Sequence, residues 1–226
     1  MNHIYKAVFF KEWIKTKIVF LLFSLLSLVA LIYNLAIWYR IATFKGASHL
    51  WEIVIGKDTL LIQSYQYLPY IMAIAMAIFQ FMPEMRERRL KLTLHLPVGH
   101  NKMASMMVLY GISMFVAYSI VMLAIALLVA NYYFPFEITA RLLSTFVTWH
   151  LGALTTYLLT SRIVLEGTRR YAITHLLVSA LIVSLFFQSS TPGAYSCFLP
   201  WIVVLCAASA GWILFSIDRF KRGVRD

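Results

Sequence analysis

The sequence predicts an all-α integral membrane protein with six transmembrane helices. Of its 226 residues, 62% are hydrophobic and only 13% are charged, which is far too apolar for a soluble domain of this length. The charged residues fall in short clusters separated by long runs without charge. A helix needs about 20 residues to cross a hydrocarbon core of about 30 Å, and these runs are long enough. The basic residues, which give a net charge of +11, lie in clusters between these runs. Their pattern therefore indicates how the chain is oriented in a membrane and does not indicate nucleic-acid binding.

The first segment, residues 3–17, is expected to be an amphipathic interfacial helix. Its aromatic and basic residues lie on different sides of a helix, with Tyr5, Phe9 and Trp13 on one and Lys11 and Lys15 near the other. Aromatic rings at headgroup depth and lysines beside lipid phosphates suit a helix on the membrane surface. The flank of a signal anchor has a similar pattern, and the sequence does not separate the two interpretations.

Charge-free windows place the six spans. They are expected at about residues 18–39, 60–83, 103–130, 142–161, 171–188 and 197–217. The last window, residues 171–217, holds two helices, and the polar sequence from Gln188 to Gly193 supplies the turn between them. We therefore expect the whole chain, residues 1–226, to form a single transmembrane domain.

The distribution of Lys and Arg predicts that both termini face the cytosol. Most of the basic residues lie in the two terminal segments and in the connections after the second and fourth spans. Cytosolic connections carry an excess of Lys and Arg. The opposite connections hold only Arg40, Lys45, Lys57 and Arg141.

The densest cluster of charge follows the second span. It runs through Glu84, Glu87 and four basic residues, Arg86, Arg88, Arg89 and Lys91. Such a segment cannot lie in hydrocarbon, so it must lie in water between two spans. A charged cytosolic segment suits docking onto a soluble partner. From charge alone, however, a loop that only fixes the topology is the better supported interpretation.

Three common catalytic and ligand-binding motifs are absent from the sequence. It has no Gly-x-x-x-x-Gly-Lys-Ser/Thr loop for nucleotide phosphates, no His-Glu-x-x-His for zinc and no Gly-x-Ser-x-Gly nucleophile. Cys197 and Cys206 lack the spacing of a zinc site. We therefore expect no catalytic residue, no metal and no cofactor bound by this chain.

Three polar residues inside the spans are candidates for a substrate path, namely Asn34, His150 and Thr155. His150 lies near the middle of its span, where a titratable group is costly and usually faces protein or a watery cavity. It could line a substrate path or relay protons. A neutral imidazole that is hydrogen-bonded between helices is the interpretation the sequence favours, because polar packing contacts are common in membrane bundles.

The topology and the segment after the second span together resemble the ABC-2 type family of ABC-transporter permeases. In that family the second span ends in Glu, and a basic, leucine-rich segment then closes on Leu-x-x-Leu-Pro-Val/Leu before a basic residue. This sequence matches with Glu84, Leu90, Leu94, Leu96, Pro97, Val98 and Lys102. Arg88 and Arg89 replace the small Gly-Thr/Ser pair of the family. Because the leucines alternate with a period of two, the conformation of residues 84–97 stays open.

The resemblance implies the membrane-spanning subunit of an ATP-driven exporter in the bacterial cytoplasmic (inner) membrane. It implies that residues 84–102 couple this chain to a separate P-loop ATP-binding subunit, which would bind ATP and Mg²⁺. The coupling residues would be Glu84, Arg88, Arg89, Leu90, Leu94 and Pro97. A second permease chain, identical or a sister, is also implied. The weakly polar interior suggests an amphipathic substrate.

An ion pair is expected to tie the coupling segment to the amino-terminal helix. Glu84 follows Pro83, which we expect to interrupt the second span, and it is then well placed to pair with Lys11 or Lys15. Two alternatives to a permease remain. One is a structural or regulatory membrane subunit of a larger complex, and the other is a membrane-embedded enzyme that uses His150 and the neighbouring threonines.

Overall fold

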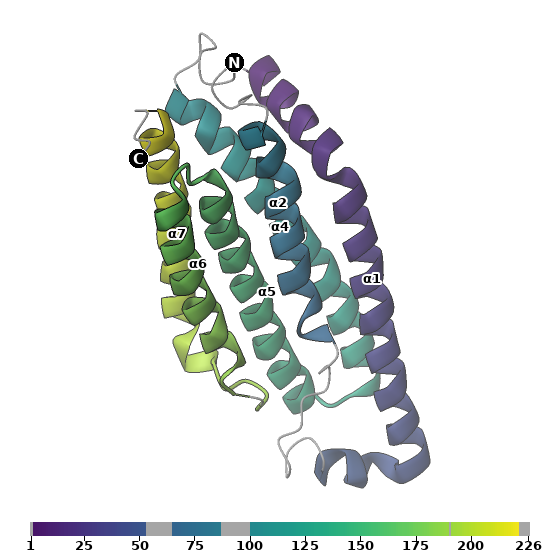
Figure 1. Cartoon of the computed structure of the whole chain (residues 1–226). Helices are drawn as coiled ribbons and strands as arrows, with labels where there is room; N and C mark the ends of the chain where they lie inside the picture. Colours follow the sequence, from purple (N-terminus) through teal and green to yellow (C-terminus); the bar gives the residue numbers. More distant parts are fainter. Residues whose placement is uncertain (1, 53–64, 87–99, 190, 222–226) are drawn as a thin grey trace.

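The protein is a bundle of long helices that alternate in direction (Figure 1). The computed structural model describes residues 2–52, 65–86, 100–189 and 191–221. Within these ranges there is no β-strand. The elements, labelled as in Figure 1, are α1 (Asn2–Trp51), α2 (Leu68–Arg86), α4 (His100–Tyr133), α5 (Phe136–Leu165), α6 (Arg169–Ser184), η3 (Leu185–Phe187), η4 (Ser196–Phe198) and α7 (Leu199–Lys221).

Six of these helices are long and apolar enough to cross a membrane, as the sequence predicts. The matching stretches are Ile4–Gly46, Leu68–Met85, Lys102–Tyr132, Phe136–Leu165, Arg169–Phe187 and Ser196–Ile213. The amino- and carboxyl-terminal ends lie at the same end of the bundle, together with the last residues of α2 (Figure 1). We call this the termini end. The turn between η3 and η4 lies at the opposite end, which we call the turn end.

Most helices extend beyond the expected spans. The spans expected at 103–130 and 142–161 correspond to α4 and α5, which are longer at both ends. Charged residues mark where a helix leaves hydrocarbon and do not stop the helix itself. The span expected from residue 60 differs, since α2 begins only at Leu68. The expected polar turn after Gln188 is confirmed, with Gly193 at a positive φ of 74°.

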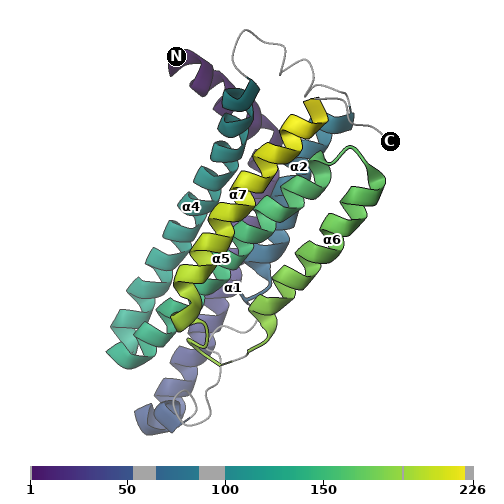
Figure 2. The same cartoon turned by 90° about the vertical axis from the view of Figure 1, so that its left-hand side faces the viewer.

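Helix α1 has no break near residue 17. Its only non-helical residue is Gly46, with φ 82° and ψ 163°. Residues 3–17 are therefore not a separate helix, and the expected boundary there is wrong. The amino-terminal turns are nevertheless tilted against the rest of α1 (Figures 1 and 2). At 1.5 Å per residue, Ile4–Gly46 measures about 65 Å, twice a hydrocarbon core, so part of α1 must lie outside it.

Helix α2 continues through Pro83 to Arg86, so the expected interruption is also wrong. Proline removes one backbone donor and crowds the carbonyl four residues earlier, which kinks or ends many helices. Here only one more turn follows, and that turn carries Glu84. The side chain of Glu84 keeps the helical register of the span, four residues after Gln80.

Helix α5 is the centre of the bundle. It packs against α2, α4, α6 and α7, and 72% of its most apolar window is buried. The corresponding fraction for Arg169–Phe187, which comprises α6 and η3, is 11%, and Ser179 is the only buried residue of α6. Figure 2 shows α6 at the edge of the bundle. Helix α6 therefore offers most of its surface to lipid or to another chain.

Two glycines let tyrosine side chains pass between helices. A Cβ atom added to Gly111 on α4 would overlap the phenol of Tyr157 on α5, and one added to Gly152 would overlap the phenol of Tyr70 on α2. Both tyrosines are buried. The absence of a side chain at these glycines sets how closely α2, α4 and α5 approach.

We predict that Gly111→Ala destabilises the bundle by about 1–3 kcal/mol, since the methyl group must displace the Tyr157 ring. The thermal unfolding of the purified chain in detergent, followed by the loss of helical circular dichroism, measures this. Gly211→Ala on α7 is the matched control, because nothing lies within 4 Å of its added Cβ. Equal unfolding temperatures for the two variants would contradict the close approach.

Candidate coupling site

A cluster of charged side chains joins α1 to the last turn of α2. Lys11 Nζ lies 2.8 Å and Lys15 Nζ 3.0 Å from the same oxygen of Glu84, Oε1. Lys15 also donates to Glu12 Oε1 at 2.7 Å and to the Gln80 carbonyl at 3.2 Å. Its three ammonium protons thus have three acceptors. These contacts include both ion pairs expected from the sequence, and the coupling role of the residues stays a prediction.

The two carboxylates of the cluster are shielded from solvent, and Lys11 lies at its exposed edge. Glu12 and Glu84 are 0% and 1% exposed, Lys15 is 16% exposed and Lys11 is 39% exposed. The two lysines and two glutamates balance one another in charge. A buried carboxylate is tolerated only when it is paired, so the four side chains depend on one another. The remaining oxygens, Glu12 Oε2 and Glu84 Oε2, have no hydrogen-bond partner among the described residues.

A polar network connects the cluster to α4 and α5. Gln80, one turn before Glu84, donates to the Met107 carbonyl of α4 at 2.9 Å. Its Oε1 accepts from the Tyr157 hydroxyl of α5 at 2.6 Å. Gln80 and Tyr157 are fully buried, so these hydrogen bonds satisfy groups that have no access to water. Gln80 therefore connects α2 to both neighbours.

A second contact ties α1 directly to α4. Thr16 on α1 lies one turn after Glu12, and its hydroxyl is 2.6 Å from that of Tyr110. The Tyr110 ring also meets Phe9 edge to face, with centroids 5.4 Å apart. At the termini end, α1, α2, α4 and α5 are thus linked by buried polar contacts.

The cluster lies directly before the segment that the sequence singles out. Arg88, Arg89, Leu90, Leu94 and Pro97 fall outside the described residues. Lys102 is exposed in the first turns of α4. Of the candidate coupling residues, Glu84 is the one that the structure places.

A second charged cluster ties α6 and α7 to α5 at the termini end. Arg162 on α5 lies 3.2 Å from His175 Nε2 on α6, and its guanidinium covers the Trp212 ring of α7 at 4.6 Å. His175 Nε2 is also 3.5 Å from Glu166 Oε2, just after α5. His175, in the second turn of α6, therefore links this helix to α5 and to the residue directly after α5.

His150 is buried in an aromatic cluster, and both of its ring nitrogens have partners. Nδ1 lies 2.9 Å from the Phe146 carbonyl, which can only accept, so Nδ1 carries a proton. Nε2 lies 3.1 Å from the Tyr65 hydroxyl, which is 3.1 Å from the hydroxyl of Tyr118. A neutral imidazole that accepts from Tyr65 satisfies every one of these groups. This arrangement matches the packing interpretation of His150.

The other two candidates for a substrate path bond to their own helices. Asn34 donates to the Ala30 carbonyl at 2.7 Å, and Thr155 donates to the Leu151 carbonyl at 2.9 Å. An apolar groove of about 160 Å³ between α4 and α5 is lined by His150 but by neither Asn34 nor Thr155. The structure does not bring the three side chains together there, and their role in a substrate path stays a prediction.

Sequence reasoning missed several members of the charged site. Glu12 lies beside Lys11 in the sequence. Its i, i+3 spacing from Lys15 is typical of an ion pair on a helix and could have predicted this contact. The i, i+4 spacing of Gln80 and Glu84 matches that of Lys11 and Lys15, which predicts two facing helix surfaces. No sequence pattern predicts the contact of Gln80 with Tyr157, because the two residues lie far apart in the sequence.

We predict that Glu84→Gln destabilises the chain by about 1.5–3 kcal/mol, because it removes one of the two carboxylates that pair with Lys15 and leaves Glu12 as the other. Lys15→Met, alone and combined with Glu84→Gln, completes a double-mutant cycle measured by thermal unfolding in detergent. A coupling energy of about 0.5–3 kcal/mol is expected for groups in contact. Glu137→Gln, on an exposed residue of α5, is the control. Additive effects of the two substitutions would rule out the ion pair.

Comparison with protein-family models, curated proteins and solved structures gives no match for this chain.

Proposed function

We propose that this chain is the membrane-spanning subunit of an ATP-driven exporter and that a separate P-loop subunit binds and hydrolyses the ATP. The observation that carries the proposal is the buried ion cluster at the end of α2. The cluster pairs Glu84, with which the charged segment begins, with two lysines of α1. A force applied to that segment would therefore act on α1 and α2 together.

The polar network supports the transmission of such a force. Gln80 joins α2 to α4 and α5, and Thr16 joins α1 to α4. Because rigid helices move as units, a displacement at the termini end would reach the membrane interior without chemistry in this chain. The proposal places that end in the cytosol, where the positive-inside rule puts the basic segments.

The proposal includes a second permease chain, identical or a sister, and an amphipathic substrate. The exposed apolar surfaces of α6 and α7 leave room for another chain. The proposed location is the bacterial cytoplasmic membrane. Both the membrane and the substrate class rest on the sequence resemblance and on the weakly polar interior of the bundle.

A structural or regulatory membrane subunit is the second candidate function. The same ion cluster would then serve only to hold the bundle together. A membrane enzyme is less well supported, because both nitrogens of His150 already have protein partners.

We predict that the tagged chain, purified from its native membrane in mild detergent, retains a P-loop ATPase at equal stoichiometry. Replacing Arg88, Arg89 and Leu90 together by alanine should abolish this association, since it removes charge and apolar surface from the coupling segment. Mass spectrometry of the eluted complex measures both. The matched control is Arg169→Gln with Arg170→Gln, which removes two exposed charges elsewhere at the termini end.

The recovery of this chain alone, or with membrane proteins that lack a P-loop, would contradict the exporter proposal. Recovery of the ATPase with the triple variant as well as with the control would leave the exporter but would reject residues 88–90 as its docking site.

A further inference from the structure

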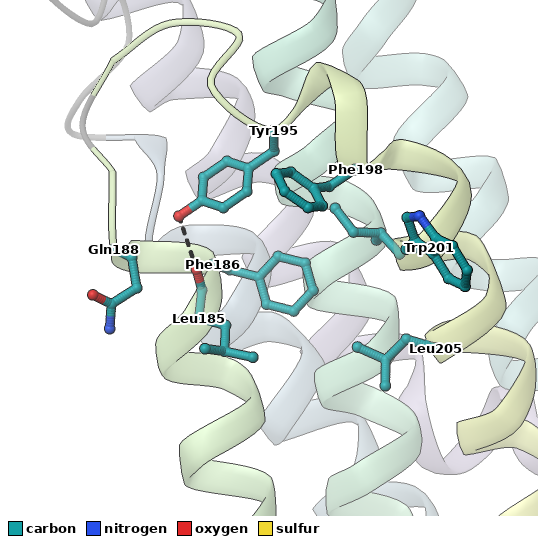
Figure 3. Close-up of a pocket in the computed structure, with 8 residues that line it drawn as sticks. Leu185, Phe186, Gln188, Tyr195, Phe198, Trp201 and Leu205 are labelled. Atoms are coloured by element: carbon teal, nitrogen blue, oxygen red, sulfur yellow. Dashed lines mark hydrogen bonds between the residues drawn. The ribbon is translucent and has the colours of Figure 1, made fainter.

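An apolar groove, which we call the aromatic groove, lies beside the turn at the turn end (Figure 3). It has a volume of about 380 Å³, a size typical of small-molecule sites, and it is bounded by η3 and the start of α7. Four aromatic side chains line it, namely Phe186, Tyr195, Phe198 and Trp201, and none of its described lining residues is charged. Phe198 and Trp201 are 60% and 71% exposed, so their rings are open to the bilayer.

The turn beside the aromatic groove is held by hydrogen bonds. The Tyr195 hydroxyl donates to the Leu185 carbonyl at 2.8 Å (Figure 3) and accepts from the Ser189 amide at 3.0 Å. The Gly193 amide donates to the Thr145 hydroxyl of α5 at 2.9 Å. These contacts fix η3 and the turn relative to α5, so the groove is preformed.

A buried hydroxyl lies behind the aromatic groove. Tyr70 on α2 is 4% exposed, and its hydroxyl has no hydrogen-bond partner among the described residues. A Cβ atom added to Gly152 of α5 would overlap both this hydroxyl and the edge of the Phe186 ring, so the two lie side by side against α5. The ring centroids of Tyr70 and Phe186 are 6.4 Å apart. Phe186 therefore has Tyr70 on one side and the groove on the other.

The unpartnered hydroxyl of Tyr70 is a feature that packing does not explain. Nearly all buried donors in proteins have an acceptor, because a donor that loses its water and gains no partner costs stability. A phenylalanine would fill the same space without that cost. Because Phe186 borders the open volume of the groove, its side chain has room to rotate, and the Tyr70 hydroxyl would then form part of the wall. A ligand that binds only this conformation would select it.

We propose that the aromatic groove binds one uncharged aromatic molecule from the bilayer, whose carbonyl oxygen accepts a hydrogen bond from Tyr70. The rings of the ligand would pack on Phe198 and Trp201. An ionic ligand fits less well, since its charge would have no partner among the described lining residues. A lipid acyl chain would fill the groove but would leave Tyr70 without an acceptor. The inference requires only that the chain spans a membrane and is independent of the exporter proposal.

The test is photolabelling of the full-length chain in phospholipid nanodiscs with benzophenone, which has two rings and one carbonyl oxygen. We expect saturable labelling of peptides that contain Phe186 or Trp201, located by mass spectrometry. Diphenylmethane has a methylene group in place of the carbonyl, and its competition with labelling measures the affinity for the rings alone. Anionic 4-benzoylbenzoate should compete much more weakly than either neutral molecule.

Tyr70→Phe removes only the hydroxyl. It should weaken benzophenone binding about fivefold, which corresponds to about 1 kcal/mol, the net contribution of one hydrogen bond. It should leave diphenylmethane binding unchanged. Because the hydroxyl has no partner among the described residues, this variant should unfold at the same temperature as the natural chain or at a higher one.

Each variant has a matched control. Tyr67→Phe removes the hydroxyl of a tyrosine that is 56% exposed and stacks on Phe187 at 5.5 Å, and it should change neither affinity. Trp201→Ala should weaken the binding of both neutral molecules, because it removes an exposed wall of the groove. Phe44→Ala removes a ring of α1 that is 82% exposed and should weaken neither.

An unchanged ratio of the benzophenone and diphenylmethane affinities in Tyr70→Phe would overturn the proposal and leave a groove that an acyl chain fills equally well. Equal effects of Tyr70→Phe and Tyr67→Phe, or of Trp201→Ala and Phe44→Ala, would also overturn it. Competition by 4-benzoylbenzoate as strong as that by diphenylmethane counts equally against it. A Tyr70→Phe variant that fails to fold, or that unfolds at a lower temperature, would show that the hydroxyl has a structural role and would reject it as a ligand contact.

Discussion

The burial of one carboxylate, that of Glu84, constrains the whole termini end of this bundle. An ionised carboxylate cannot be removed from water unless cations and donors replace the water. Lys11 and Lys15 supply that replacement from α1, and Lys15 in turn holds Glu12. Helix α1 therefore cannot leave α2 at this end without exposing buried charge or leaving it unpaired. This constraint explains why the amino-terminal turns of α1, tilted against the rest of that helix, stay packed on the bundle.

The two ends of the bundle are held together by different kinds of contact. At the termini end, charged and amide side chains join the helices, in one cluster around Glu84 and in another around Arg162. At the turn end, the connection between η3 and η4 is held by hydrogen bonds of Tyr195 and Gly193, and the aromatic groove lies beside it. Helix α5 runs between the two ends and is buried for most of its length. A change at the termini end therefore has a continuous packed route to the turn end.

The sequence predicted the six apolar helices that the described residues form and the pairing of Glu84 with the two lysines, because charge-free length and helical spacing are local properties. It did not predict that α2 would continue through Pro83, or that α1 would pass residue 17 without a break. Both continuations depend on packing against neighbouring helices, which offsets the free energy that the local sequence costs the helix. The contact between Gln80 and Tyr157 depends on Gly111, whose missing side chain makes room for the phenol. Such a fit between three helices has no signature in any one of them.

We infer that the ion cluster makes α1 and α2 one rigid unit. Spin labels at two exposed residues, Phe10 on α1 and Met82 on α2, would measure this by double electron–electron resonance, with Cys197 and Cys206 replaced by serine. We expect a single narrow distance distribution, which Glu84→Gln broadens or shifts to longer distances while the helical content is retained. An unchanged narrow distribution in that variant would show that apolar packing alone holds the two helices together and that the ion cluster does not.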